Sequence, residues 1–297
     1  MRLYLIYILL IGLSFRLSAQ KRKDTLIDRI ELATVAQANQ GESYITFPTD
    51  IGNIEPLWFE ANIVPNFNIR KSKDSRFLGV LTPQIIIRMY QEESFPVRTP
   101  SYMPQITLYY SLISRKEVKN LSLFGRIAHH SNGQDGNFYT DSGYVNYKNG
   151  SFATNYFEFG GVHTRYNVHF NAVMFFSSSF EWHPKALSID ELLGIYSRYR
   201  WNNIFSIFKL PRDVKKHQKA SISLKGELSW NFGEMYDWDA WSYKRINAKF
   251  TFYYHPKFFE DIGFFAEIYT GMDYYNIYFN HYITVMRFGI MTEKLRF

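Results

Sequence analysis

The chain of 297 residues carries a formal net charge of +7 at pH 7, contains no cysteine, and is 19% aromatic, with 27 Phe and 23 Tyr. The lack of cysteine excludes disulfides and thiolate metal sites, so any metal ligands must be oxygen or nitrogen atoms. After the N-terminus no stretch approaches 18 consecutive apolar residues, which excludes a membrane protein built from helices. The basic residues are scattered along the chain, which disfavours nucleic-acid binding.

The N-terminus has the three parts of a secretory signal peptide. Arg2 is followed by an apolar run from Leu3 to Phe15, and Leu17-Ser18-Ala19 provides small residues for cleavage. The apolar run is too short for a spanning helix, which needs about 20 residues. We therefore expect residues 1–19 to be removed on export.

Residues 20–50 are polar and without clear periodicity, and we expect them to form an N-terminal extension. Residues 51–297 read as a succession of strands. The clearest is 220–230, in which Ile222, Leu224 and Leu228 alternate with Ser223, Lys225 and Glu227. Further strands are expected near 56–70, 76–90, 103–113, 119–131, 151–166, 168–182, 191–208, 247–254, 262–272 and 281–291.

Segments of about ten alternating residues, separated by turns, are typical of a transmembrane antiparallel β-barrel in the outer membrane. Because such barrels have an even number of strands, we predict about 12. The many rings suit the two aromatic girdles of such a barrel, and Phe297 resembles a barrel assembly signal. A soluble β-sandwich also alternates, but it would have to bury these rings in a correspondingly large core. The polar stretches 132–150 and 230–246 are expected to be extracellular loops.

Three polar residues share the apolar faces of two predicted strands. His129 and Ser131 are in register with Leu123, and Asn155 is in register with Phe159. Successive side chains of a strand point to opposite faces, and the apolar face of a membrane barrel contacts lipid. The pattern therefore predicts a polar cluster that faces lipid, which favours an enzyme with a lipid substrate.

These residue types can form a hydrolytic triad. An imidazole at His129 would take the proton of the Ser131 hydroxyl, and the amide oxygen of Asn155 would hold the imidazole in the required tautomer. Gly133 allows an unusual backbone angle after the serine, so its amide is a candidate oxyanion donor. The alternative interpretation is that Ser-Asn-Gly is simply turn chemistry at the top of a hairpin. His130 belongs to the opposite face, which disfavours a metal pair with its neighbour.

Residues 128–133, Ala-His-His-Ser-Asn-Gly, resemble the Asn-His-Asp-Ser-Asn-Gly pattern of the outer-membrane phospholipase A family, calcium-dependent dimeric barrels of Gram-negative bacteria. Residues 102–106, Tyr-Met-Pro-Gln-Ile, also resemble a family segment. The resemblance implies catalytic roles for His129, Ser131 and Asn155, and a homodimer that binds Ca²⁺. The site would face the outer leaflet of the outer membrane.

The same resemblance implies metal ligands. Ser151 matches the serine that binds calcium within one subunit, and Gln134 stands where the family uses a backbone carbonyl. Ser94 matches the serine that reaches the calcium of the partner subunit. Alternatively, Asp135 and Asp141 could donate carboxylates from the long loop. The loop between Gly133 and Ser151 is longer than in the family and His130 replaces an aspartate, which leaves the calcium geometry open.

The sequence thus predicts a calcium-dependent serine hydrolase that cleaves acyl esters of glycerophospholipids. One rival is a lipid A deacylase-type barrel, which also carries a His-x-Ser pair on its outer surface but uses a carboxylate to orient the histidine. The other is a passive porin or structural barrel, for which charged pairs filling the lumen would argue against an open pore.

Overall fold

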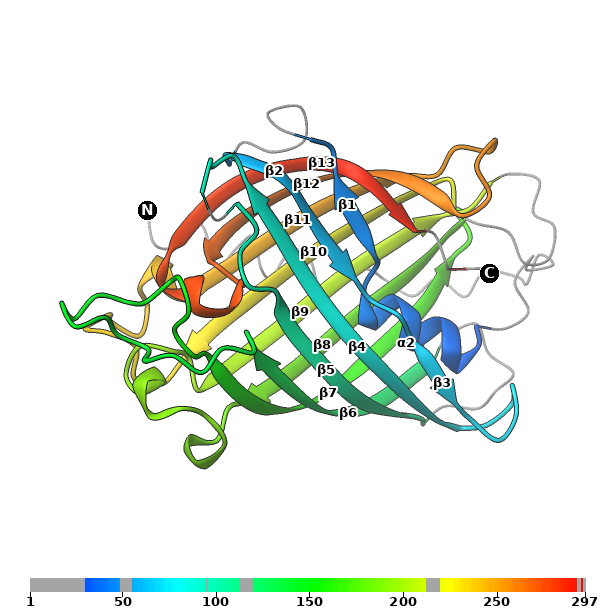
Figure 1. The fold of residues 1–297 in the computed structure, drawn as a ribbon. Helices are drawn as coiled ribbons and strands as arrows, with labels where there is room; N and C mark the ends of the chain where they lie inside the picture. Colours follow the sequence, from blue (N-terminus) through cyan, green and yellow to red (C-terminus); the bar gives the residue numbers. More distant parts are fainter. Residues whose placement is uncertain are drawn as a thin grey trace, which may run out of the picture.

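The chain folds into a closed antiparallel β-barrel (Figure 1). The computed structural model describes residues 30–48, 55–94, 96–112, 120–211, 220–292 and 295. The predicted signal peptide and Phe297 lie outside these residues. The strands are β1 Tyr44–Thr46, β2 Leu57–Ile63, β3 Phe67–Ile69, β4 Phe77–Tyr90, β5 Ser101–Ser111, β6 Asn120–Ser131, β7 Ala153–Asn167, β8 Ala172–Trp182, β9 Tyr199–Lys209, β10 Ile222–Phe232, β11 Ile246–Tyr254, β12 Ile262–Met272 and β13 Tyr282–Thr292.

Closure depends on the first strands of the chain. β1 pairs with β13 on one side and with β2 on the other, and β2 pairs with β4. β3 continues along β4 after β2, so the two segments together form one position in the wall. The thirteen segments therefore fill twelve positions, which confirms the predicted barrel and strand number.

The outer surface is apolar and the interior is polar. Ile127 and Phe159 point outward and are 59% and 61% exposed. Monomeric soluble proteins rarely expose a contiguous apolar belt of this kind. Inside, Arg88 is fully buried between Glu60, at 2.6 Å, and Asp273, at 2.7 Å. This arrangement is opposite to that of a soluble β-sandwich, whose apolar faces would be buried.

The segment predicted to be a polar extension contains structure inside the barrel. Residues 32–40 form helix α2, Leu32–Gln40, which lies at the end of the barrel away from the long loops (Figure 1). Its Val35 and Ala36 are buried in an apolar cluster with residues of the wall. At its C-terminal end, Gln40 Nε2 donates to Thr107 Oγ1 at 3.0 Å, and Arg126 Nη2 donates to Gln40 Oε1 at 3.3 Å. The helix therefore fills part of the lumen. No helix within the described residues is long and apolar enough to cross a membrane.

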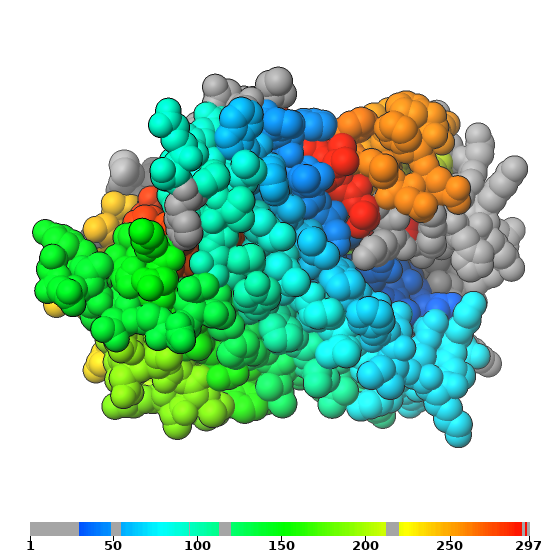
Figure 2. All heavy atoms as spheres, viewed as in Figure 1, coloured from blue at the N-terminus to red at the C-terminus, as the bar shows by residue number. Residues whose placement is uncertain are grey.

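The three longest connections between strands lie at one end of the barrel. The longest, residues 132–152 between β6 and β7, projects at the left in Figures 1 and 2. The loops β8–β9 and β12–β13 share its rim and contain the 3₁₀ helices η2 Lys185–Leu187, η3 Asp190–Leu192 and η5 Asn276–Asn280, while η4 Tyr243–Arg245 precedes β11. Tyr147 of the β6–β7 loop hydrogen bonds to His281 Nε2 at 3.0 Å, which ties this loop to the β12–β13 loop.

Candidate active site

The barrel register places the three candidate side chains together on the outer surface. In the pairing of β6 with β7, His129 lies directly opposite Asn155, and Ser131 lies opposite Ala153. Their outward direction follows from their neighbours, because the alternate residues Ala128 and Thr154 are buried inside. The alternation in the sequence predicts this arrangement, and only the structure adds the cross-strand register.

Two hydrogen bonds fix the orientation of the Asn155 amide. Its Nδ2 donates to the Leu187 carbonyl at 2.8 Å, and its Oδ1 lies 2.9 Å from His129 Nδ1. A carbonyl oxygen only accepts, so the NH₂ group must face Leu187 and the oxygen must face His129. His129 Nδ1 therefore carries the proton, and the neutral ring keeps the lone pair of Nε2 free to act as a base.

The Ser131 hydroxyl is half-buried and lies two residues from His129 on the same face of β6. Within the described part of the chain this hydroxyl makes no hydrogen bond. The link between Ser131, the candidate nucleophile, and His129, the candidate base, is thus not closed in this structure. Such links are commonly long or poorly aligned in enzymes without substrate and tighten when substrate binds.

Gly133 has a left-handed backbone, with φ at +67°. This conformation favours glycine, and a Cβ here would also lie 3.3 Å from Tyr102 Cε2. Among the described residues the Gly133 amide donates to no acceptor, so it is available as an oxyanion donor two residues after Ser131.

Asn132, between these two residues, holds the loop in place. It is 2% exposed, its Oδ1 accepts from the amides of Gln134 at 3.2 Å and Phe152 at 3.0 Å, and its Nδ2 donates to the Gly150 carbonyl at 2.8 Å. The sequence indicates a turn at Ser-Asn-Gly but not these hydrogen bonds, because Gly150 and Phe152 come from the far end of the loop.

The hydrogen bonds of Asn132 also bring two of the predicted calcium ligands near each other. Since the amides of Gln134 and Phe152 converge on one oxygen, the Gln134 backbone lies beside Ser151. The Ser151 hydroxyl has no hydrogen-bond partner in the described part of the chain. Ser94 is exposed in the β4–β5 loop on the same rim, away from this pair in sequence. These are neutral oxygen donors of the kind that calcium accepts.

Acidic ligands are not gathered at the site. Asp135 and Asp141 are both exposed. Within the described residues no group of three His, Cys, Asp or Glu side chains could hold a metal ion. A calcium site here would therefore depend on hydroxyl and carbonyl oxygens and on water.

The Leu187 carbonyl that holds Asn155 comes from the β8–β9 loop, and no pattern in the sequence connects this loop with the candidate triad. The strand predicted at 191–208 is wrong at its start, because β9 begins at Tyr199. Gly194, with φ at +76°, interrupts the extended chain, and residues 190–192 form the 3₁₀ helix η3. The residues just before η3, 187–189, lie over the beginning of β7, where the Ile189 amide donates to the Ala153 carbonyl at 3.1 Å.

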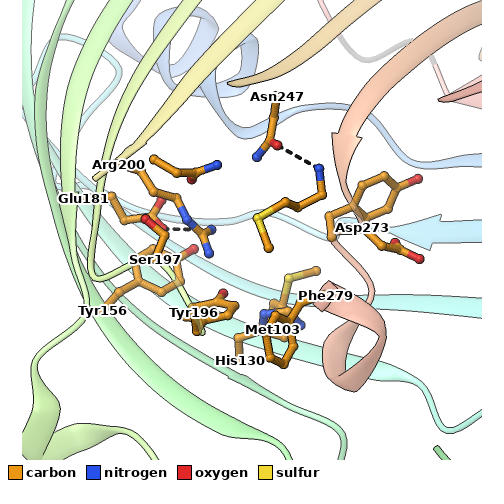
Figure 3. A pocket seen from close by; sticks show the side chains of 13 residues that line it. Met103, His130, Tyr156, Glu181, Tyr196, Ser197, Arg200, Asn247, Asp273 and Phe279 are labelled. Atoms are coloured by element: carbon orange, nitrogen blue, oxygen red, sulfur yellow. Dashed lines mark hydrogen bonds and ion pairs between the residues drawn. The ribbon is translucent and has the colours of Figure 1, made fainter. Parts of the chain in front are cut away.

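A cavity of about 130 Å³ lies inside the barrel (Figure 3). It lies across the wall from the three candidate side chains, because successive residues of a strand point to opposite faces. His130 and Tyr156, the neighbours of His129 and Asn155, point into it together with Glu181 and Arg200. Burial raises the pKa of the Tyr196 phenol, which also lines the cavity, so this hydroxyl stays protonated. The cavity is separate from the candidate active site, which faces outward.

Comparisons of the fold identify similar solved structures. Outer membrane phospholipase A from Escherichia coli superimposes with a TM-score of 0.57 at 13% identity, over 90% of this chain and 99% of that one. The chain has the fold of outer membrane phospholipase A. The phospholipase from Salmonella typhi, solved as a dimer with bound calcium, gives a TM-score of 0.58 at 12% identity over 91% and 99% of the two chains. An active-site mutant of the Escherichia coli phospholipase gives 0.57 at 12% identity, over 93% and 95%.

Comparisons at the level of sequence find nothing. No protein-family model matches the chain, and no curated protein matches it. The likeness to the phospholipase structures therefore concerns the fold alone.

Proposed function

We propose that the protein is a calcium-dependent phospholipase that hydrolyses acyl esters of glycerophospholipids in the outer membrane of a Gram-negative bacterium. The observation that carries this proposal is the fixed amide of Asn155, which leaves Nε2 of His129 unprotonated on the same face of β6 as Ser131. The group lies on the apolar outer surface, where the acyl chains of a lipid have direct access.

The side chains provide each proton transfer of ester hydrolysis. His129 Nε2 takes the proton of the Ser131 hydroxyl while Ser131 Oγ attacks the acyl carbonyl. The charge on the carbonyl oxygen faces the amide of Gly133. His129 then gives its proton to the departing lysolipid oxygen, and water releases the fatty acid from Ser131 by the same exchange in reverse.

The donor atoms at the site fit calcium but do not complete its shell. Calcium takes six to eight oxygen ligands, whereas one chain offers the Ser151 hydroxyl and the Gln134 carbonyl. We infer that waters and a second copy of the chain, through Ser94, supply the rest, so that the active form is a homodimer. When bound, the ion would add positive charge where the oxyanion forms.

The first rival is a lipid A deacylase-type barrel. That assignment requires a carboxylate beside the histidine, but the Nδ1 partner of His129 is the Asn155 amide. The second is a passive porin. The ion pairs of Glu227 with Lys225, at 3.1 Å, and with Lys249, at 2.9 Å, lie along the inner wall of β10 and β11. Together with helix α2, which fills part of the lumen, they disfavour an open pore.

The deciding experiment measures fatty acid release from phosphatidylcholine micelles by the refolded protein, with calcium and with chelator. We expect calcium-dependent release that Ser131→Ala abolishes. Ser178→Ala, which removes another outward hydroxyl on β8, is the matched control and should retain activity. Release that persists in chelator would support the triad and exclude a role for calcium. No release from folded, dimeric protein would leave the lipid A deacylase or the passive barrel.

A further inference from the structure

Two neighbouring residues of β7 hold the same short segment of the β8–β9 loop from opposite sides of the barrel wall. Asn155 faces outward and donates to the Leu187 carbonyl. Thr154 faces inward, is fully buried, and its Oγ1 lies 2.7 Å from Ser188 Oγ. A backbone hydrogen bond from Ile189 to the Ala153 carbonyl, at 3.1 Å, lies beside them.

The hydrogen bonds continue from Thr154 into the lumen. Thr154 Oγ1 lies 2.9 Å from His183 Nδ1, and His183 Nε2 lies 2.7 Å from Glu181 Oε1. A carboxylate only accepts, so His183 Nε2 carries a proton. In the neutral ring, His183 Nδ1 then accepts from the Thr154 hydroxyl, which is left to accept from Ser188.

The inner end of this series is anchored to the next strand. Glu181, in the wall of the cavity in Figure 3, pairs with Arg200 at 3.1 Å and accepts from Asn202 Nδ2 at 3.1 Å. Both partners belong to β9. A continuous set of hydrogen bonds therefore runs from β9, through the buried His183, to the loop segment that touches Asn155.

We propose that Thr154 and His183 are positioning residues for the triad, and this inference rests on the proposed function. They hold Ser188, and with it the adjoining Leu187 carbonyl, at the place that sets the direction of the Asn155 amide. Thr154 and His183 touch neither the substrate nor the reacting atoms.

The direction of the amide decides whether His129 can act. If the Leu187 carbonyl moves away, the Asn155 amide is free to turn over and present its NH₂ group to His129 Nδ1. That nitrogen must then accept, so the proton moves to Nε2, which can no longer take a proton from Ser131. Loss of the buried hydrogen bonds that run from Thr154 through His183 should therefore lower kcat and leave KM nearly unchanged.

The test compares three substitutions on β7. Thr154→Val keeps the side-chain shape and removes the hydroxyl, and we expect kcat to fall on the order of ten-fold. Thr154→Ser restores the hydroxyl and should restore kcat. The matched control is Thr164→Val, because Thr164 is also fully buried on the inner face of β7 and its hydroxyl has no partner among the described residues. Ser188→Ala tests the same link from the loop if the β7 variant does not fold.

A double-mutant cycle separates positioning from general damage. In an Asn155→Ala background there is no amide to orient, so Thr154→Val should have almost no further effect on kcat. An equal loss in both backgrounds would overturn the proposal, and so would an unchanged kcat in the single variant.

A second measurement does not depend on the substrate. An alkyl sulfonyl fluoride reacts with an activated serine, and the rate of Ser131 labelling reports on the His129 base directly. Slower labelling of Thr154→Val supports the positioning role even if the native protein hydrolyses no phospholipid, in which case only the proposed function fails. Equal labelling rates for Thr154→Val and the native protein would overturn the inference, even if the native protein is an active phospholipase.

Discussion

Replacing Asn155 tests whether its amide orients His129. Asn155→Ala removes two hydrogen bonds, at 2.9 Å to His129 and at 2.8 Å to Leu187. Each contributes about 0.5–1.5 kcal/mol net, so the substitution takes about 1–3 kcal/mol from the organised site. In the transition state this corresponds to a fall in kcat of roughly 5- to 150-fold.

The more informative substitution is Asn155→Asp. A carboxylate stabilises an imidazolium better than an amide does, which alone would raise activity. However, the second carboxylate oxygen would face the Leu187 carbonyl at the position of the present 2.8 Å hydrogen bond. Two acceptors repel there, so we expect Asn155→Asp to be less active than the native protein at neutral pH.

The assay is the initial rate of fatty acid release from phosphatidylcholine micelles at saturating calcium. Asn203→Ala, which removes an outward amide on β9, is the control and should retain the native rate. Full activity of Asn155→Ala would show that the amide does not orient His129. A rate of Asn155→Asp above the native rate would show that the Leu187 carbonyl does not restrict the group.

Three other predictions follow from single contacts. Gly133→Ala places a Cβ 3.3 Å from Tyr102 at a φ of +67°, which costs about 1–2 kcal/mol in backbone energy, so kcat should fall. The control Gly143→Ala, at a φ of +80° with open space around it, should not lower kcat. Ser151→Ala should raise the calcium concentration for half-maximal activity on the order of ten-fold, as expected for about 1.4 kcal/mol of lost binding, and an unchanged calcium dependence would remove Ser151 from the site. Arg88→Met leaves two buried carboxylates without this partner and should lower the free energy of unfolding by about 3–5 kcal/mol. Urea unfolding of the protein in lipid vesicles, followed by tryptophan fluorescence, should then show a lower midpoint, and an unchanged midpoint would contradict this expectation.

Much of the barrel could be predicted because its signal is local. Each wall strand alternates between lipid and lumen, so residues such as Leu228 and Glu227 reveal their faces without knowledge of their neighbours. The same alternation assigns His129, Ser131 and Asn155 to one surface. Helix α2 gives no such signal, because it is packed within the lumen and its polar residues have partners there.

The support of the site could not be predicted, because it depends on contacts between distant segments. Nothing in the sequence near Asn155 indicates that the Leu187 carbonyl returns to it across 32 residues. The partner His183 has no ligand or triad spacing in the sequence, yet it is 3% exposed and lies inside the barrel.

The two faces of the wall explain why a hydrolase fits this barrel better than a passive channel. A pore needs a lumen open to water, whereas here α2 and buried pairs such as Arg88 with Glu60 occupy it. In a purely structural barrel the hydrogen-bonded pair of His129 and Asn155 would have no role among the apolar side chains of the outer surface, where a polar group without a partner costs free energy. In the proposed function, the polar interior instead provides fixed points from which the wall holds the side chains of His129 and Asn155 against lipid. The polar side chains of the lumen therefore help to hold the polar side chains of the outer surface in position.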